Sequence, residues 1–154
     1  MQRGSCFDCA LRVLALRDHS VAELRRKLKT KGYLQDEVEG SIARLLELNY
    51  LDDTRFARGF AESSIRNGRG YGARLKLELA RRGVAGDIVQ ATLAEVSEEF
   101  GEAETLARTI ERRYPGFDPS TASDKERRKI VSYLQRKGFS LSAILAGLKI
   151  HSIF

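Results

Sequence analysis

Hydrophobic positions recur along the chain in three copies of one pattern. In each copy two apolar residues stand four apart, a glycine follows four residues after the second, and a further apolar residue comes directly after it. The segments cover residues 24–32, 75–83 and 130–138, so the glycines are Gly32, Gly83 and Gly138. Apolar residues four apart mark the buried stripe of a helix, and glycine favours the left-handed backbone of a helix C-cap. The pattern predicts a helix that ends in a tight glycine turn.

A second apolar pair follows each glycine after six and ten residues, which predicts another helix after each turn. Asp36, Asp87 and Ser142 stand four residues after the glycines, and all three are residue types preferred at helix N-caps. We therefore expect the second helices to begin there.

A third helix is expected before each of these pairs, at about residues 6–18, 53–67 and 98–114. The expected buried stripes are Leu11, Leu14 and Ala15, then Phe56, Phe60 and Ile65, then Leu106, Ala107 and Ile110. Ser20-x-x-Glu23 and Ser123-x-x-Glu126 are capping-box patterns for two of the middle helices. The glycine-rich segment 68–72, expected to be a flexible break, and the two prolines, Pro115 and Pro119, separate helices in the second and third copies.

These elements predict an all-α fold of three tandem three-helix repeats, at residues 1–52, 53–97 and 98–154. One such unit has too little core to be secure alone. Stacking would bury the shared faces and give an elongated, curved array. The alternative is a globular packing of nine helices, for which a radius of gyration of about 15 Å is expected.

Composition changes this picture little. The chain has 154 residues, of which 42% are hydrophobic, so it can build a core. It has no run of about 18 apolar residues that would span a membrane, and residues 1–5 lack the apolar segment of a signal peptide. We expect a cytoplasmic protein, with no membrane partner and a monomeric state.

The repeat shows where along the sequence the basic residues behind the net charge of +6 are concentrated. Basic residues gather on the middle helix of each repeat, where acids are almost absent. The clusters are Arg25, Arg26, Lys27, Lys29 and Lys31; Arg69, Arg74, Lys76, Arg81 and Arg82; and Lys125, Arg127, Arg128, Lys129, Arg136 and Lys137. Any one cluster is explained as a solvated helix face. Three at equivalent positions favour a long, negatively charged partner, such as nucleic acid or a filament assembled on it.

Few residues suggest other chemistry. Tyr71 and Tyr133 lie among the basic residues and are candidates for stacking on bases, while Tyr33 and Phe139 are expected to pack at helix ends. Backbone amides of the 68–72 segment, beside Arg69 and Arg74, are candidate phosphate ligands.

No catalytic residue, metal site or cofactor is expected. Cys6 and Cys9 form a lone C-x-x-C without a second ligand pair, and a structural zinc site needs four ligands. His19 and His151 are the two histidines, and they assemble no Ser/His/Asp or Cys/His set with other residues. Asp52 and Asp53 are more simply explained as helix caps than as metal ligands.

Several motifs together resemble the RecX family. They are Asn49-Tyr-Leu-Asp-Asp-Thr-Arg-Phe-Ala57, Asn67-Gly-Arg-Gly-Tyr-Gly72 and Leu79-Ala-Arg-Arg-Gly83, with weaker likenesses that extend over residues 9–150. Within the first motif, Leu51 and Phe56 are expected in the core, and Asp52 or Asp53 is expected to cap a helix. Arg55 is expected to pair with an acid, and Tyr50 belongs to the same structural motif.

The resemblance implies tandem three-helix modules and a non-enzymatic regulator of the RecA recombinase. Members of that family bind the RecA–DNA filament in its groove and inhibit strand exchange, ATP hydrolysis and co-protease activity, within recombination, DNA repair and the SOS response. From the residues alone, two other functions stay open. One is a stand-alone nucleic-acid-binding module, on single- or double-stranded DNA, and the other is an enzyme with a metal at the cysteines.

Overall fold

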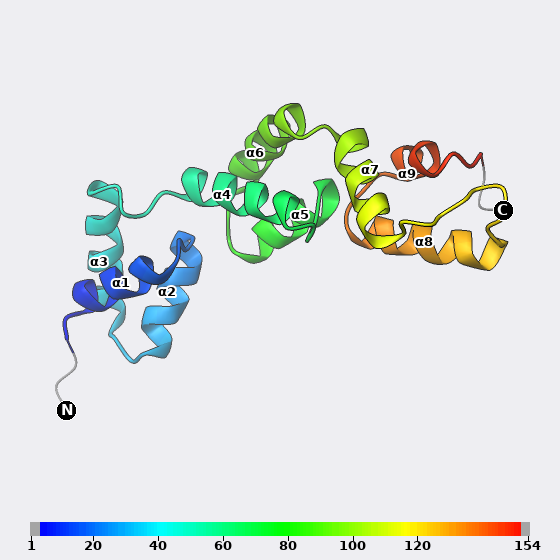
Figure 1. The fold of residues 1–154 in the computed structure, drawn as a ribbon. Coiled ribbons are helices and arrows are strands. Elements are labelled where there is room, and N and C mark those ends of the chain that lie inside the picture. Colours follow the sequence, from blue (N-terminus) through cyan, green and yellow to red (C-terminus); the bar gives the residue numbers. More distant parts are fainter. Residues whose placement is uncertain (1–3, 152–154) are drawn as a thin grey trace. The chain divides into compact units, whose positions relative to one another are not determined.

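The computed structural model describes residues 4–151, and these form nine α-helices without a strand. Residues 1–3 and 152–154, which belong to the expected first and third repeats, lie outside the described part. The helices are α1 (Cys6–Leu16), α2 (Val21–Thr30), α3 (Gln35–Glu47), α4 (Asp53–Arg66), α5 (Gly72–Arg81), α6 (Gly86–Glu99), α7 (Glu102–Arg113), α8 (Asp124–Arg136) and α9 (Leu141–Leu148) (Figure 1). The prediction of an all-α fold is confirmed, and none of these helices is long and apolar enough to cross a membrane.

The three glycine turns form as the sequence predicts. Gly32, Gly83 and Gly138 have φ angles of 95°, 80° and 105°, in the region that favours glycine. In each turn the amide after the glycine donates to the carbonyl of the second leucine of the apolar pair, at 3.1–3.3 Å. This is the Schellman hydrogen bond, and it ends α2, α5 and α8 in the same way.

The N-caps predicted after these turns are wrong by two residues. The N-caps are Leu34 for α3 and Ser140 for α9, and the Ser140 hydroxyl accepts from the Ala143 amide. Because the Schellman turn needs one residue after the glycine, the chain is already extended at the next position and the helix starts there. Asp36, Asp87 and Ser142 therefore lie inside the first turn of their helices, where carboxylates still favour the helix dipole.

Three predictions about the first helices also need correction, and one of them is Ala107, which is exposed rather than buried in α7. In α1 the buried residues are Cys6, Cys9, Ala10 and Val13, whereas Leu11 and Leu14 are half-buried and Ala15 is exposed. The helix before α8 begins at Glu102 rather than 98, because α6 continues to Glu99 and Gly101 is the N-cap of α7. Glu98 and Glu99 thus lie at the end of α6, where they oppose its dipole.

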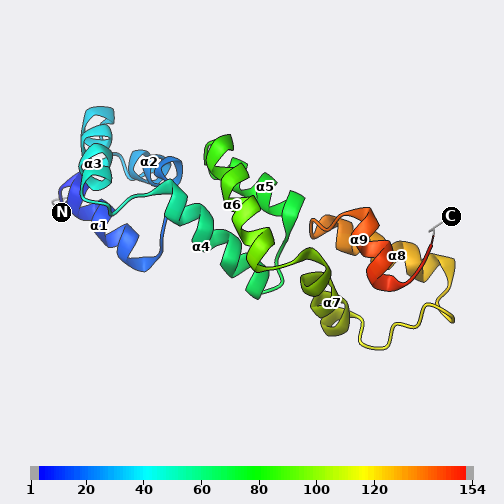
Figure 2. The same ribbon diagram turned by 90° about the horizontal axis from the view of Figure 1, so that it is seen from above.

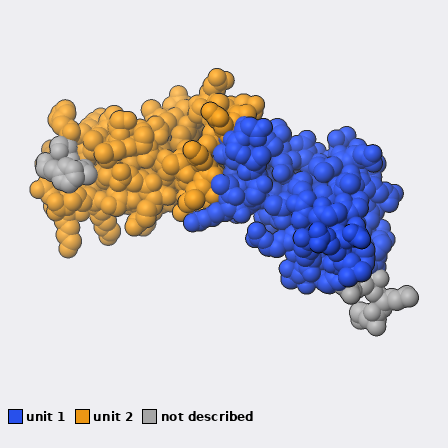
Figure 3. Space-filling model, turned by 180° about the vertical axis from the view of Figure 1, so that it is seen from behind, with its two compact units in different colours: residues 1–59, 79–89 blue, residues 60–78, 90–154 orange. Residues whose placement is uncertain are grey.

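The chain divides by contact into two compact units, each with its own core (Figure 3). Unit 1 comprises residues 1–59 and 79–89, and unit 2 comprises residues 60–78 and 90–154, so residues of the second expected repeat contribute to both. The repeat boundaries at 52/53 and 97/98 stay a prediction.

Unit 1 buries the apolar pairs of α2 and α3 against α1. Leu24, Leu28, Val38 and Leu45 are fully inaccessible to solvent, and Leu51 from the segment before α4 joins them. The capping box at Ser20 is complete: its hydroxyl accepts from the Glu23 amide, and the Glu23 carboxylate accepts from the Ser20 amide, both at 3.0 Å.

Unit 2 contains α7, α8 and α9, together with parts of α4, α5 and α6. Figure 2 shows α9 lying along α8, with the proline segment joining α7 to α8. Its core includes Leu75, Leu106, Leu134 and Ile144, all fully buried, and Ile65. At Ser123 only half of the expected capping box is present, the bond from the Glu126 amide to the serine hydroxyl at 3.1 Å.

Candidate binding surface on the middle helices

The basic residues of α2 divide into one paired and several exposed side chains. The Arg25 guanidinium donates to both carboxylate oxygens of Glu39 on α3, at 2.7 and 3.2 Å. This pair raises the pKa of Arg25 and lowers that of Glu39. Arg26, Lys27 and Lys29 are exposed on the remaining surface and form no salt bridge within residues 4–151; Lys31 is also exposed.

Most basic residues in or next to α5 bond to neighbouring groups near the two ends of the helix. Arg74 pairs with Glu78 one turn along the helix, at 3.1 Å, and Arg82 lies 3.8 Å from Glu23. Arg69 donates to the Ser63 hydroxyl before α5 begins. Lys76 and Arg81 are the exposed α5 cations for which the described structure contains no ion pair.

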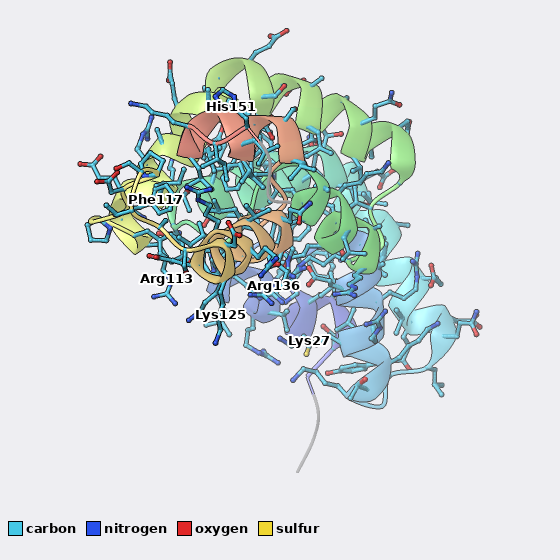
Figure 4. All side chains as sticks on the ribbon, turned by 90° about the vertical axis from the view of Figure 1, so that its right-hand side faces the viewer. Lys27, Arg113, Phe117, Lys125, Arg136 and His151 are labelled. Carbon is cyan, nitrogen blue, oxygen red and sulfur yellow. The ribbon has the colours of Figure 1, made fainter. Side chains whose placement is uncertain are left out.

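On α8 the exposed cations form one stripe. Lys125, Arg128, Lys129 and Arg136 follow helical spacing on the side away from buried Ile130 and Leu134. Figure 4 shows the Lys125 side chain extending from α8 into solvent. The other two predicted residues have local roles: Arg127 donates to the Pro119 carbonyl, and Lys137 lies 5.5 Å from the Tyr133 ring centre.

The predicted basic residues are therefore of two kinds. Arg25, Arg74, Arg82, Arg127 and Lys137 hold neighbouring parts of the chain together. The exposed cations that form no hydrogen bond or ion pair with the described residues make up what we call the open basic set: Arg26, Lys27, Lys29, Lys76, Arg81, Lys125, Arg128, Lys129 and Arg136. Arg69, which donates to Ser63, and Lys31 are in neither list. The sequence alone does not distinguish the two kinds.

A repeated junction joins consecutive middle helices end to end. In unit 1 the end of α5 meets the start of α2: the Ser20 hydroxyl donates to the Arg82 carbonyl at 2.6 Å. Gly83 lies so close to α2 that a Cβ added there would be 2.3 Å from the Ala22 Cβ. Glycine is thus needed for close approach as well as for its positive φ.

The equivalent junction in unit 2 joins the end of α8 to the start of α5. The Tyr71 amide donates to the Lys137 carbonyl at 2.8 Å, and the Ala73 amide donates to the Gly138 carbonyl at 3.4 Å. A Cβ at Gly138 would lie 1.9 Å from the Tyr71 carbonyl oxygen. Ser20 and Tyr71 occupy equivalent positions in the repeat, 51 residues apart, and Arg82 and Lys137 do so 55 residues apart. The same contact is therefore made twice, once through a side-chain hydroxyl and once through a backbone amide.

These contacts correct two hypotheses about phosphate and base binding. Within the segment 68–72 the Gly68, Arg69 and Tyr71 amides already donate to backbone carbonyls, and Gly70 is buried. The segment is therefore a packed joint rather than a flexible loop. Tyr71 is buried, stacks on Phe139 at 5.3 Å and donates its hydroxyl to the Phe100 carbonyl at 2.6 Å. It cannot stack on a base.

The other aromatic residues also have partners in the chain. Tyr133 meets Tyr114 edge-on at 5.7 Å, and the Arg113 guanidinium lies 5.3 Å from its ring centre. The Tyr33 hydroxyl donates to the Gly4 carbonyl, and Phe139 is buried, so both pack at helix ends as expected.

The motif at residues 49–57 has an architectural role. Leu51 and Phe56 are buried, as predicted. Asp52 caps α4 by accepting from the Arg55 amide at 3.1 Å, whereas Asp53 accepts from the Val21 amide at 2.8 Å and so ties α4 to the start of α2. The expected acid partner of Arg55 is wrong, because its guanidinium donates to the backbone carbonyls of Asn49 and Tyr50; the Tyr50 side chain is exposed.

The cysteines and histidines assemble no common site. Cys6 and Cys9 are both buried and free in α1. His19 is buried beside the Ser20 junction residue, and burial lowers its pKa below the usual 6.5. No group of three or more His, Cys, Asp or Glu residues within 4–151 is arranged to hold a metal ion.

The helices, glycine turns and end-to-end junctions define a class of all-helical protein built from tandem three-helix units. Models of the RecX family match each unit in order: the first three-helix domain matches residues 6–45, the second 52–93 and the third 101–146. The chain belongs to the RecX family of regulatory proteins.

Relatives support this assignment over nearly the whole chain. The chain is 38% identical over 143 residues to the regulatory protein RecX of Syntrophotalea carbinolica, covering 93% of both proteins. It is 38% identical over 138 residues to that of Trichlorobacter lovleyi, covering 90% of both. The fold resembles the crystal structure of RecX from Lactobacillus salivarius, with a TM-score of 0.74 at 21% identity, covering 94% of this chain and 92% of that one.

Proposed function

We propose that the protein is a non-enzymatic regulator that binds the RecA–single-stranded DNA filament and inhibits recombinase activity. The inhibited activities would be strand exchange, ATP hydrolysis and co-protease action. Binding in the filament groove would block extension or promote disassembly. Membership of the RecX family carries this proposal, because the family matches cover all three helical domains.

The open basic set supports a polyanionic partner. These cations come from all three middle helices, and their charges are not neutralised by carboxylates of the described chain. Cations of this kind bind phosphates by releasing counterions, which gives salt-dependent affinity. Surface ion pairs such as Arg25–Glu39 contribute little to a binding surface of this kind, because the guanidinium is already bonded.

The direct test is a titration of ATP hydrolysis by the recombinase on single-stranded DNA. Substoichiometric amounts of the protein should slow hydrolysis, because one molecule that blocks extension or promotes disassembly affects many recombinase subunits. Unchanged hydrolysis at equimolar protein would contradict the proposal.

A charge reversal locates the surface involved. We expect Lys76→Glu with Arg81→Glu to weaken inhibition while helicity by circular dichroism is retained, because both side chains are exposed. Reversal of Arg74 or Arg82 is a poorer probe, since these residues pair with Glu78 and Glu23. Arg12→Glu with Lys149→Glu makes the same charge change outside the middle helices and should inhibit normally.

The second candidate function is a stand-alone nucleic-acid-binding module, which the same open basic set favours. It predicts tight binding to DNA without recombinase, and log affinity falling linearly with log salt by about 0.7 per phosphate contact for a single strand. Weak binding at physiological salt, with inhibition of the recombinase intact, would exclude this candidate and leave the first.

A further inference from the structure

Unit 2 contains a small cavity that the predicted basic clusters do not include. It lies between the end of α4 and α7 and is lined by Ile65, Arg66, Gly68, Phe100, Thr105, Arg108, Thr109 and Arg112. Its volume is about 40 Å³, more than the roughly 10–15 Å³ that one water needs. The cavity can therefore admit a group larger than a single water.

Three guanidinium groups line this cavity without a carboxylate. Arg66, Arg108 and Arg112 form no salt bridge with any acid within residues 4–151. Arg108 and Arg112 stand four apart on α7, a spacing at which like charges repel. Of the acids on α7, Glu102 is engaged by the Ser140 amide and hydroxyl, both at 3.0 Å. The cavity thus concentrates positive charge that no carboxylate of residues 4–151 pairs with.

The fold gives two of these side chains, Arg66 and Arg112, a defined neighbour. The Arg66 guanidinium lies 5.5 Å from the Phe100 ring centre, a cation–π distance. Gly68 has a φ of 68°, and a Cβ there would lie 3.4 Å from Arg112 Nη1, so the backbone approaches this guanidinium closely. Arg66 and Arg112 also lie in the last turns of α4 and α7, where the helix dipole favours cations. Charge is therefore assembled here at little cost to folding.

Thr105 supplies a second, independent feature of the cavity. The residue is only 8% exposed and lines the cavity, yet its hydroxyl has no hydrogen-bond partner among the described residues. The Thr109 hydroxyl, by contrast, donates to the Thr105 carbonyl at 2.9 Å. The Thr105 hydroxyl oxygen is not sealed from solvent, so the hydroxyl is free to donate to a group that enters the cavity.

We propose that this cavity binds a phosphate group through Arg66, Arg108 and Arg112, with the Thr105 hydroxyl as an additional donor. Guanidinium groups match the geometry of phosphate oxygens with paired N–H donors. The phosphate could come from a nucleic-acid strand or from a free phosphate ion. This site does not depend on binding to a recombinase.

The test compares thermal unfolding in inorganic phosphate or pyrophosphate with unfolding in sodium chloride of the same ionic strength, and adds binding of a short oligothymidylate. A ligand of the folded state raises the midpoint with concentration. Arg108→Gln and Arg112→Gln should each weaken binding at least about tenfold, as expected for a lost charged hydrogen bond. In phosphate-free, low-salt buffer they should unfold near the wild-type midpoint, because relief of the Arg108–Arg112 repulsion offsets the lost interaction with the helix dipole.

Arg113→Gln is the matched control. It removes the same charge from the neighbouring position, but Arg113 lies over Tyr114 and Tyr133 rather than in the cavity. Thr105→Val removes only the hydroxyl and should weaken binding without changing charge. If only the oligonucleotide depends on Arg108 and Arg112, the source is the strand; if phosphate ions suffice, it is the free ion. Equal losses in Arg113→Gln, or no loss in the cavity variants with either probe, would overturn the proposal.

Discussion

Replacement of Gly83 by alanine tests the end-to-end junction of α5 on α2. An alanine held in the left-handed backbone conformation destabilises the folded protein by about 1–2 kcal/mol. The reduced conformational freedom of the unfolded chain offsets about 0.4–1 kcal/mol of this loss. The new methyl would also lie 2.3 Å from the Ala22 Cβ, far inside the contact distance of about 3.5–4.0 Å. The turn must therefore move away from α2.

That movement lengthens the bond from the Ser20 hydroxyl to the Arg82 carbonyl, which is 2.6 Å in the structure. Because Ser20 is fully buried, loss of this hydrogen bond leaves an unsatisfied polar group, which costs about 1–3 kcal/mol. We expect Gly83→Ala to lower the free energy of unfolding by about 2–4 kcal/mol in total. Equilibrium urea denaturation measures this loss.

Two further variants separate the contact from the backbone cost. Gly32→Ala places the same methyl group in the same kind of Schellman turn, at a φ of 95°, and so measures the backbone cost of the substitution. In a double-mutant cycle, Ala22→Gly should recover part of the Gly83→Ala loss, with a coupling energy well above the 0.3–0.5 kcal/mol or so of independent sites. Additive effects, or equal losses in Gly32→Ala and Gly83→Ala, would refute the junction.

Three other predictions concern buried groups. Tyr71→Phe should cost about 1 kcal/mol, because it removes the hydroxyl bond to the Phe100 carbonyl while the stacking on Phe139 is kept; urea unfolding measures this, and an unchanged midpoint would contradict it. Because the pKa of His19 is lowered in the folded protein, the unfolded chain binds a proton at a higher pH than the folded protein does. The free energy of unfolding therefore has its full value above about pH 6.5 and decreases below that pH. His19→Gln should flatten this dependence between pH 7.5 and 5.5. Cys6→Ala with Cys9→Ala should lower stability through lost packing while recombinase inhibition and metal content match the wild type, and a metal lost with the cysteines would reverse that expectation.

The sequence predicts the helices and the glycine turns well because those features are local. A leucine pair four apart and a glycine four residues later determine both the buried stripe and the left-handed cap. The phase of α1 is harder to predict, because Cys6, Cys9 and Val13 form an apolar stripe as plausible as Leu11 and Leu14, and only packing against α3 selects between them. The N-caps were misplaced because local preference for aspartate at an N-cap competes with the geometry of the preceding turn.

The pattern of the middle helices cannot predict contacts between residues that are far apart in the sequence. Asp53 accepts from Val21, and Ser20 donates to Arg82, contacts that no spacing rule predicts. The same limit applies to charge: Arg82 and Arg81 stand side by side in the sequence, but only Arg82 lies near a distant carboxylate, that of Glu23. The Arg74–Glu78 pair, by contrast, is local, with the two residues four apart on α5. The cavity arginines were missed because they come from α4 and α7 and form no run in the sequence.

The two junctions explain why the basic clusters and the glycines occur together. Each middle helix ends in carbonyls that a partner must satisfy, and the N-terminal turn of the preceding middle helix offers donors. In the sequence a basic residue stands directly before each glycine, as Arg82 and Lys137 do, where it favours the helix C-terminus. Some of the basic residues that recur in the repeats therefore stabilise the ends of the middle helices and the junctions between them. Among the predicted basic residues of the middle helices, these contacts leave the open basic set exposed to an anionic partner.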